Sequence, residues 1–335
     1  MRKVLHFFLT AIITGAAIVS LTGCGSKDKP SDLTPVTLNE VAHSIFYAPQ
    51  YAAIELGYFK EEGIDLKLVN GAGADKVMTA LISGDADIGF MGSEASIYTY
   101  ANGSDDYAVN FAQLTQRAGN FLVGRTSQPD FKWTDLKGKK VLGGRAGGMP
   151  QMVFEYILKK NGIDPATDLA IDQSIQFGLT AAAFTSNDAD YTVEFEPFAT
   201  GLEKEGSGFV VASLGVNSGY VPYTAYSAKK SYLKKNPETV QKFTNAIQKG
   251  MEFVNTHSSD EIAKVIQPQF KETDVKTIAA IVDRYKSQDS WKKDTVFEKD
   301  SFELLENILE EAGQLKERVP YEELVTTEFS EKAAK

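Results

Sequence analysis

Apolar residues near the start of the chain form one long run, whereas the remainder consists of short apolar segments separated by polar turns. Arg2 and Lys3 precede an apolar run from Phe7 to Leu21, and small residues then lead to Cys24. A basic start, an apolar middle and a small-residue end are typical of a secretory signal. We therefore predict a signal peptide over 1–23. No later apolar run is long enough to span a bilayer.

Cys24 is the only cysteine, so the chain cannot form an internal disulfide. The sequence Leu21-Thr22-Gly23-Cys24 resembles the lipobox of bacterial lipoproteins, in which the cysteine is lipidated and becomes the new N-terminus. An uncleaved transmembrane helix is the alternative, because the run is close to the ~20 residues that span a bilayer. The small residues before Cys24 and the polar segment after it favour lipidation, for example by palmitate. Residues 24–34 then form a flexible tether.

Short strings recur about 100 residues apart and in the same order. Each member of the first pair opens a helical pattern with proline in its first turn, where the missing N–H costs nothing. The members of the second pair follow the end of that helix, and those of the third pair lead into a strand. The pairs are Pro49-Gln50 and Pro150-Gln151, Gly63-Ile64-Asp65 and Gly162-Ile163-Asp164, and Asp85-Ala86-Asp87 and Asp188-Ala189-Asp190.

In both halves, the spacing of apolar residues predicts the same order of helices and strands. The predicted first half has a helix to about residue 56, a strand over 64–69, a helix over 75–82 and a strand over 88–91. The predicted second half has a helix to about residue 160, a strand over 169–172, a helix over 178–185 and a strand over 191–195. Alternating strands and helices of this kind indicate an α/β fold with mostly parallel sheets and helices on both faces.

The two halves are not expected to be consecutive domains. Short strands at 121–125 and 223–227 flank the second half and are suited to carry the chain across and back. The chain after residue 231 is mostly helical, with a long helix over 237–256 that we expect to pack on the first half. We therefore predict a discontinuous lobe I over 35–126 and 222–335, an inserted lobe II over 127–221, and a cleft between them.

The formal charge of −10 at pH 7 argues against binding to nucleic acid or docking on anionic lipid. We therefore expect contact with the membrane through lipid on Cys24 only, and a location outside the cytoplasm on the bacterial cell membrane.

Several segments together resemble a known family. The run from Phe46 to Leu66 is similar to the opening of the ABC-importer solute-binding proteins for nitrate, sulfonates, taurine and thiamine-precursor pyrimidines, the SsuA/THI5-like or NMT1 family. Segments 80–90, 135–141 and 194–198 are also similar to segments of this family. The resemblance implies a two-lobed type II periplasmic-binding-protein fold that closes on a small solute. It also implies a permease and a cytoplasmic ATPase as partners. We further expect a monomer, no cofactor and no enzymatic activity.

Ligands of open α/β sheets bind at the carboxyl ends of strands, beside helix N-termini that suit anionic groups. The stretches 44–48 and 145–149, which precede the repeated Pro-Gln helices, should face each other across the cleft. Residues 92–94 and 116–120 should also reach it. The candidate ligand-binding residues are Ser44, Phe46, Tyr47, Gly92, Ser93, Glu94, Arg117, Asn120, Arg145, Gly147, Gly148, Met149, Gln151, Phe177, Glu194, Glu196 and Tyr223. No metal-ligand cluster appears in the sequence.

Each of these types of residue has a structural alternative. Ser93 could cap a helix, Arg117 could pair with a surface acid, and the aromatic residues could belong to the core. Glu194 and Glu196 are two residues apart, so a strand would place both on one face, where they could bind a ligand N–H or form a salt bridge between the lobes.

The class of ligand stays open at this stage. Helix N-termini and Arg145 favour an anionic group, whereas the glutamates favour a nitrogenous one, and a zwitterion or a nitrogen heterocycle satisfies both. The cysteine-rich stretch of the thiamine-pyrimidine binders is missing, because Tyr191-Thr192-Val193 occupies the comparable place.

Two other functions remain as alternatives to solute transport. An enzyme on the same scaffold is one, although the sequence has no G-x-S-x-G motif and Cys24 is assigned to lipidation. A surface sensor or adhesin is the other, and it would present a broad apolar patch instead of a cleft.

Overall fold

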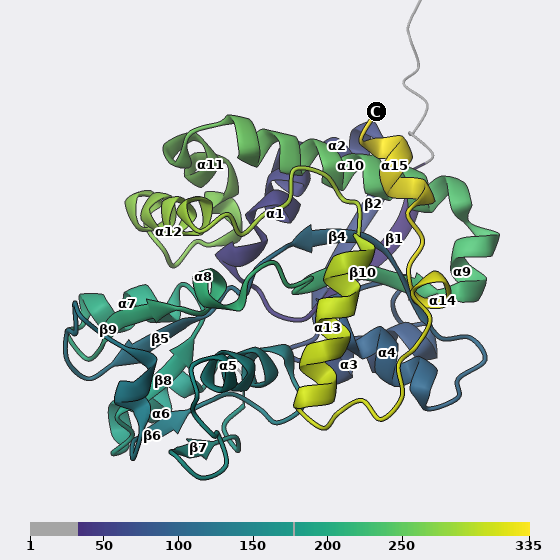
Figure 1. Ribbon diagram of the computed structural model, residues 1–335. Helices are drawn as coiled ribbons and strands as arrows, with labels where there is room; N and C mark the ends of the chain where they lie inside the picture. The colour runs from purple at the N-terminus through teal and green to yellow at the C-terminus, as the bar shows by residue number, and fades with distance from the viewer. Residues whose placement is uncertain (1–32, 177) are drawn as a thin grey trace, which may run out of the picture. The chain divides into compact units, whose positions relative to one another are not determined.

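The computed structural model describes residues 33–176 and 178–335, so the predicted signal peptide, Cys24, most of the tether and Phe177 lie outside the described residues. The described residues from Leu33 to Lys335 form one unit that contains two five-stranded sheets flanked by helices (Figure 1). The strand order is β2-β1-β3-β10-β4 in the first sheet and β7-β6-β8-β5-β9 in the second. Three strands of each sheet are parallel, and the earliest of these three in the sequence lies between the next two: β1 lies between β2 and β3, and β6 lies between β7 and β8.

In the first sheet, β1 is parallel to β2 and β3, and β10 is antiparallel to β3 and β4. In the second sheet, β6 is parallel to β7 and β8, and β5 is antiparallel to β8 and β9. The expected α/β fold with two sheets flanked by helices is therefore confirmed, and both sheets are mixed, with two parallel and two antiparallel strand pairs in each. The strands are β1 Thr34–Glu40, β2 Ile64–Asn70, β3 Ile88–Gly92, β4 Ala108–Thr115, β5 Phe121–Gly124, β6 Lys140–Leu142, β7 Ala170–Asp172, β8 Tyr191–Glu194, β9 Phe209–Ser213 and β10 Thr224–Lys229.

The helices between the strands include the four whose ranges or ends were predicted, which lie close to those predictions, and others for which no range was predicted. They are α1 Ala48–Glu55, α2 Tyr58–Glu61, α3 Ala74–Ser83, α4 Glu94–Ala101, α5 Met149–Lys160, α6 Thr180–Ser186, α7 Phe198–Lys204 and α8 Leu214–Ser218, with short 3₁₀ turns η1 Ile45–Tyr47 and η2 Trp133–Leu136. Proline occupies the first turn of both α1 and α5, as the repeated Pro-Gln pairs predict.

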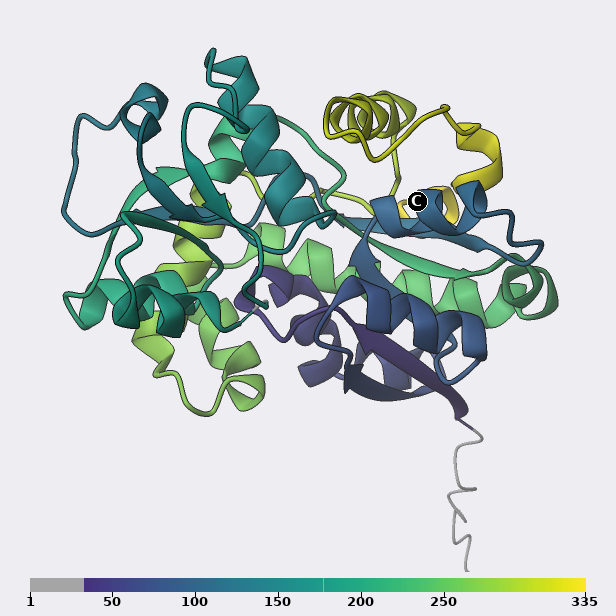
Figure 2. The same ribbon diagram turned by 90° about the horizontal axis from the view of Figure 1, so that it is seen from below.

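The last third of the chain is helical. Its elements are α9 Lys230–Lys235, α10 Pro237–Thr256, α11 Ser259–Ile266, η3 Gln267–Gln269, α12 Val275–Ser287, α13 Lys299–Glu311, α14 Tyr321–Leu324 and α15 Glu328–Ala333. As expected, α10 packs on α1 and α2, whereas α13 reaches α5, and Figures 1 and 2 both show α13 beside α5. The contact of α10 with α1 is so close that a Cβ on Gly250 would lie 2.2 Å from the carbonyl oxygen of Pro49.

The strands β5 and β10 lie in different sheets and are hydrogen-bonded to different partners. The first strand of the second sheet is thus β5, which begins at Phe121. The last strand that returns to the first sheet is β10, which begins at Thr224. Among the described helices, none is long and apolar enough to cross a membrane.

The last aspartate of each repeated Asp-Ala-Asp segment makes the same contact in both sheets. Asp87 Oδ2 accepts a hydrogen bond from the Thr37 N–H of β1 at 2.8 Å. Asp190 Oδ2 accepts one from the Lys140 N–H of β6 at 2.9 Å. Ala86 and Ala189 are both buried. Each last aspartate therefore satisfies a backbone donor beside the central strand of its sheet, which gives a physical reason for this part of the repeat.

We expect Asp87→Ala and Asp190→Ala each to lower the free energy of unfolding by about 1 kcal/mol, because a backbone N–H loses its partner. Asp85→Ala is the matched control, because the one bond that the Asp85 side chain accepts within the described residues comes from the exposed Ser83 hydroxyl. Urea unfolding of the three variants checks this. Equal losses for Asp85→Ala and Asp87→Ala would contradict the assigned role.

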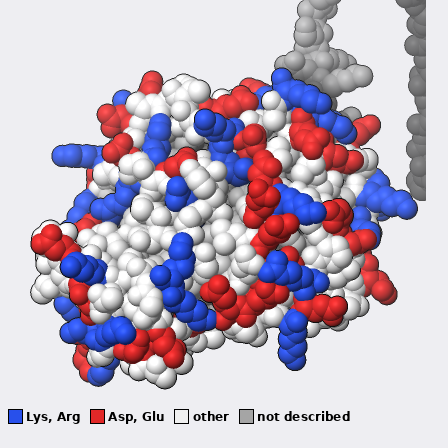
Figure 3. Space-filling model, in the orientation of Figure 1, with Lys and Arg blue, Asp and Glu red and all other residues white. Residues whose placement is uncertain are grey.

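Charged side chains are unevenly distributed on the surface. Figure 3 shows acidic side chains gathered over α13, a helix that carries Glu303, Glu310 and Glu311 at exposed positions. Basic and acidic side chains alternate over much of the remaining visible face. The last third of the chain therefore carries part of the net negative charge.

Candidate functional site

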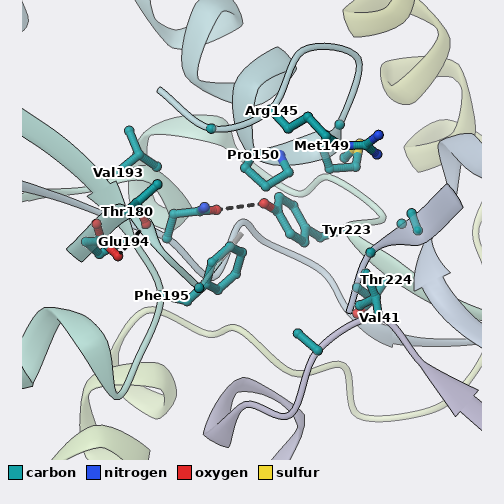
Figure 4. Close-up of a pocket in the computed structure, with 18 of the residues that line it drawn as sticks. Val41, Arg145, Met149, Pro150, Thr180, Val193, Glu194, Phe195, Tyr223 and Thr224 are labelled. Atoms are coloured by element: carbon teal, nitrogen blue, oxygen red, sulfur yellow. Dashed lines mark hydrogen bonds between the residues drawn. The ribbon is translucent and has the colours of Figure 1, made fainter. Parts of the chain in front are cut away.

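A pocket lies where both sheets present the carboxyl ends of their strands and the N-termini of the following helices. It encloses an empty volume of about 840 Å³, including the solvent at its mouth. Figure 4 shows residues of the second sheet and its loops, such as Thr180, Glu194 and Arg145, opposite Val41 and Thr224 of the first. A solute in this pocket would therefore touch both sheets, as the cleft hypothesis requires.

Nine of the predicted residues line this pocket. They come from the loop before α1, the β3–α4 turn, the segment before β5, the loop before α5, the end of β8 and the start of β10. They are Tyr47, Gly92, Glu94, Asn120, Arg145, Gly148, Met149, Glu194 and Tyr223.

Glu94 is the first residue of α4 and is only 2% exposed. Burial raises the pKa of its carboxyl to about 7, although hydrogen bonding from the backbone N–H groups of Glu94 and Met149 and the charge of Arg145 act in the opposite direction. Its Oε2 atom has no hydrogen-bond partner within the described residues. Glu94 therefore lines the pocket with one carboxyl oxygen that has no partner.

Glu194 is the last residue of β8 and is 1% exposed. Its Oε1 accepts a bond from Thr192 Oγ1 at 2.6 Å, and its Oε2 accepts one from Thr180 Oγ1 at 3.0 Å. Burial raises the pKa of this carboxyl to about 7, and the two hydroxyls partly offset the effect. A second buried acid thus lines the pocket from the other sheet.

Arg145 is the one Lys or Arg among the described residues that line the pocket, and it pairs with an acid of α3, a helix that packs against β3 of the first sheet. Its Nη2 lies 3.3 Å from Asp75 Oδ1, and its side chain is 41% exposed. Solvent and Asp75 therefore reduce the positive charge that Arg145 offers to the pocket. The charge of the pocket is therefore determined mainly by the two buried carboxyls, Glu94 and Glu194.

Asn120 and Tyr223 add neutral polar groups. Tyr223 Oη donates to Asn120 Oδ1 at 2.7 Å, the bond drawn as a dashed line to Tyr223 in Figure 4. The Nδ2 atom of Asn120 is buried without a hydrogen-bond partner within the described residues. An N–H donor and a carboxylate acceptor are therefore both unsatisfied in one pocket, which suits a solute that carries an N–H group and an acceptor.

The other predicted residues that the structure describes do not line the pocket. Ser44 Oγ donates to the carbonyl oxygen of Glu196 at 2.9 Å, and Ser93 Oγ donates to that of Pro222. Gln151 Oε1 accepts from the Gly147 N–H at 2.9 Å. These side chains hold loops beside the pocket in place.

Arg117, Phe46 and Glu196 are likewise engaged elsewhere. Arg117 Nη1 donates to the Gly215 carbonyl oxygen at 3.1 Å, and Phe46 is fully buried with its ring centroid 5.1 Å from that of Tyr285. Glu196 Oε1 lies 2.6 Å from Arg284 Nη1. The strand β8 ends at Glu194, so the alternation that would place Glu194 and Glu196 on one face does not extend to Glu196.

The sequence analysis missed the remaining lining residues. Most are small or apolar, and they occupy loops and the ends of strands and helices, whose position at the pocket depends on how the two sheets pack. Only the Gly71-Ala72-Gly73 turn, between a predicted strand and a predicted helix, offered a signal. The missed residues are Val41, Ala42, Gly73, Ala74, Gly144, Pro150, Gly178, Thr180, Val193, Phe195, Phe198 and Thr224.

No group of three or more His, Cys, Asp or Glu side chains that could hold a metal ion occurs among residues 33–176 and 178–335.

Several known proteins are similar to this chain. YtlA of Bacillus subtilis (strain 168), which carries the name of a binding protein, is 48% identical over 313 residues, which is 93% of each chain. The 4-amino-5-hydroxymethyl-2-methylpyrimidine phosphate synthase THI11 of Saccharomyces cerevisiae (strain ATCC 204508 / S288c) is 27% identical over 228 residues, which is 62% of this chain and 63% of the yeast protein.

Two solved structures share the fold. The nitrate-binding protein NrtA of Synechocystis PCC 6803 matches with a TM-score of 0.74 at 15% identity, over 90% of this chain and 89% of NrtA. The alkanesulfonate-binding protein SsuA of Xanthomonas axonopodis pv. citri, bound to MOPS, matches with a TM-score of 0.68 at 16% identity, over 88% of this chain and 99% of SsuA. The type II periplasmic-binding-protein fold predicted from the sequence is thus confirmed.

The model of one protein family, described as NMT1/THI5 like, matches residues 45–260, which run from η1 to the start of α11 and include every strand except β1. This match covers most of the described residues, and the relationship with YtlA covers nearly the whole chain. The chain therefore belongs to the NMT1/THI5-like family.

Proposed function

We propose that this protein is the extracytoplasmic solute-binding component of an ABC importer, and that it captures a small nitrogen-containing organic solute between its two sheets. The solute then passes to a membrane permease that a cytoplasmic ATPase drives. The observation that carries the proposal is the pair of buried carboxyls, Glu94 and Glu194, that line one pocket from opposite sheets.

The charge of the pocket favours a cationic or N–H-donating solute over an anion. A buried carboxylate without a nearby buried cation is costly, and a solute that donates a charge-assisted hydrogen bond removes that cost. NrtA and SsuA are named for nitrate and alkanesulfonate. The two buried glutamates of this chain support a different class of solute.

Contacts that join the sheets at the pocket support capture by closure. Arg145 of the α5 loop pairs with Asp75 of α3, and Tyr98 Oη of α4 donates to the Gly147 carbonyl oxygen at 3.2 Å. A solute that bonds to Glu94 and Glu194 together would add differential affinity for the closed arrangement, which is what drives closure.

A thermal-shift screen tests this proposal. Small amines, amidines and nitrogen heterocycles are compared with sulfonates, carboxylates and nitrate of similar size. We expect at least one nitrogenous compound to raise the midpoint of unfolding by about 3 °C or more, because a ligand that binds only the native state stabilises it. A shift with sulfonates or nitrate alone would contradict the proposed solute class.

The proposal includes a lipid anchor on Cys24, since the segment Leu21–Cys24 resembles a lipobox. More than one acyl chain is needed for a stable anchor. We expect Cys24→Ser to release the protein from the membrane fraction while solute affinity stays unchanged. Fractionation and calorimetry of the released protein measure both effects. Membrane retention of Cys24→Ser would contradict the anchor.

Binding without chemical change is part of the proposal. The yeast relative is named as a phosphate synthase, but it matches only 62% of this chain. We expect a bound solute to be recovered chemically unchanged after long incubation, as mass spectrometry would show. A new product would favour an enzyme instead.

A further inference from the structure

The carboxylate of Glu94 lies directly over the backbone of the β3–α4 turn. A Cβ on Gly92 would lie 2.1 Å from Glu94 Oε2 and 2.6 Å from Oε1. No side chain larger than hydrogen can stand at position 92 while the carboxylate keeps this place. The turn is therefore shaped to fold the side chain of Glu94 back over β3, into the pocket and not out to solvent.

The opposite wall at this point is the N-terminus of α5, a helix of 12 residues whose N-cap, Gly148, offers no side-chain cap. The backbone N–H of Met149 acts on the Glu94 carboxyl from this side and opposes the rise in its pKa that burial causes. Free N–H groups at a helix N-terminus attract anions. In this chain the group that meets them is an acid supplied from the other sheet.

We propose that Glu94 determines solute specificity as a built-in anion. Its carboxylate occupies the anion-attracting N-terminus of α5 and excludes solutes that carry a negative group, while its unpartnered Oε2 accepts an N–H of the solute. This inference rests on the proposed function, since it names the residue by which a nitrogenous solute is selected.

Glu194 is a matched control for Glu94. Both acids are almost fully buried in the same pocket. Both oxygens of Glu194, however, accept bonds from threonine hydroxyls, one of them Thr180 at the start of α6, so Glu194 is engaged away from the N-terminus of α5. Removing the charge of Glu194 should therefore leave the N-terminus of α5 occupied by Glu94.

The experiment measures ethanesulfonate binding by calorimetry at about pH 8, where a carboxyl with a pKa near 7 is ionised. The proteins are wild type, Glu94→Ala, Glu94→Gln and Glu194→Gln. We expect Glu94→Ala to bind ethanesulfonate about tenfold more tightly than wild type or more, because the helix N-terminus becomes free and a repulsive charge is lost. The gain in affinity for ethanesulfonate should be smaller for Glu94→Gln and smallest for Glu194→Gln.

Two results would overturn the inference: affinity for ethanesulfonate that is equal in wild type and Glu94→Ala, or a gain in Glu194→Gln as large as in Glu94→Gln. Should Glu94→Ala prove unstable, Glu94→Gln, which keeps the size of the side chain, decides between the same outcomes. Failure of the proposed function has a different signature, because wild type would then bind no nitrogenous compound whatever Glu94→Ala does with ethanesulfonate.

Discussion

Binding of a cationic solute is expected to weaken by about tenfold for each carboxyl that must be ionised when the pH falls from about 8 to about 6. Burial raises the pKa of both Glu94 and Glu194 to about 7. If both acids bind the solute in ionised form, the loss approaches about a hundredfold.

The stability of the solute-free protein should change in the opposite direction. An acid whose pKa is raised from 4.5 to about 7 on folding binds more protons in the folded state between those values. The free energy of unfolding therefore falls as the pH rises from about 4.5 to about 7, and this contribution is constant above and below that window. Other groups around the pocket include Arg145, Asp75 and the buried Tyr47, and the variants below separate their effects.

Calorimetry with a nitrogenous compound from the screen, at several pH values, measures the affinity. The double variant Glu94→Gln/Glu194→Gln is the control and should show weaker binding with little dependence on pH over this range. A wild-type affinity that stays constant between about pH 8 and 6 would exclude ionised Glu94 and Glu194 as the groups that bind the solute.

Replacing Arg284 is expected to have the largest effect on stability. Glu196 is fully buried, and its Oε1 lies 2.6 Å from Arg284 Nη1, while Arg284 Nη2 also binds Glu203 Oε2 at 2.9 Å. Arg284→Met leaves the carboxylate with bonds only from Thr200, and a buried charge without its partner costs about 3–5 kcal/mol.

Urea unfolding at neutral pH of Arg284→Met, Glu196→Gln and the double variant measures this effect. The double variant should recover most of the loss, because no charge then remains to be buried without a partner. The loss for Arg284→Met should also be smaller at about pH 5. Burial raises the pKa of Glu196 and the charge of Arg284 opposes that rise, so the acid is protonated more readily once Arg284 is gone. A loss below about 1 kcal/mol that Glu196→Gln leaves unchanged would contradict a structural role for the pair.

The Arg284 pair also shows where prediction from the sequence reached its limit. The spacing of Glu194 and Glu196 suggested that both acids share one face, but β8 ends at Glu194 and the next acid meets α12. The end of a strand and the partner of a buried acid depend on contacts with a helix almost 90 residues later in the chain. The residues around Glu196 in the sequence do not indicate a partner that lies so far along the chain.

The repeated features were predictable because each has a local physical cause. The Pro-Gln pairs begin α1 and α5, Gly63 and Gly162 adopt positive φ at the ends of helices, and the Asp-Ala-Asp segments bond to β1 and β6. From these, the positions of Glu94 and Met149 beside the pocket followed. The small lining residues, such as Ala74 and Gly178, did not, because they carry no chemistry that a sequence pattern can reveal.

The central proposal is that Glu94 and Glu194 hold a nitrogenous solute between the two sheets, and native mass spectrometry of freshly purified protein tests it most directly. We predict a non-covalent adduct in the wild-type protein whose mass corresponds to a small nitrogen-containing organic molecule, and its loss from Glu94→Gln/Glu194→Gln. An adduct that is a sulfonate, nitrate or another anion without basic nitrogen, or one that the double variant retains in full, would contradict the proposal.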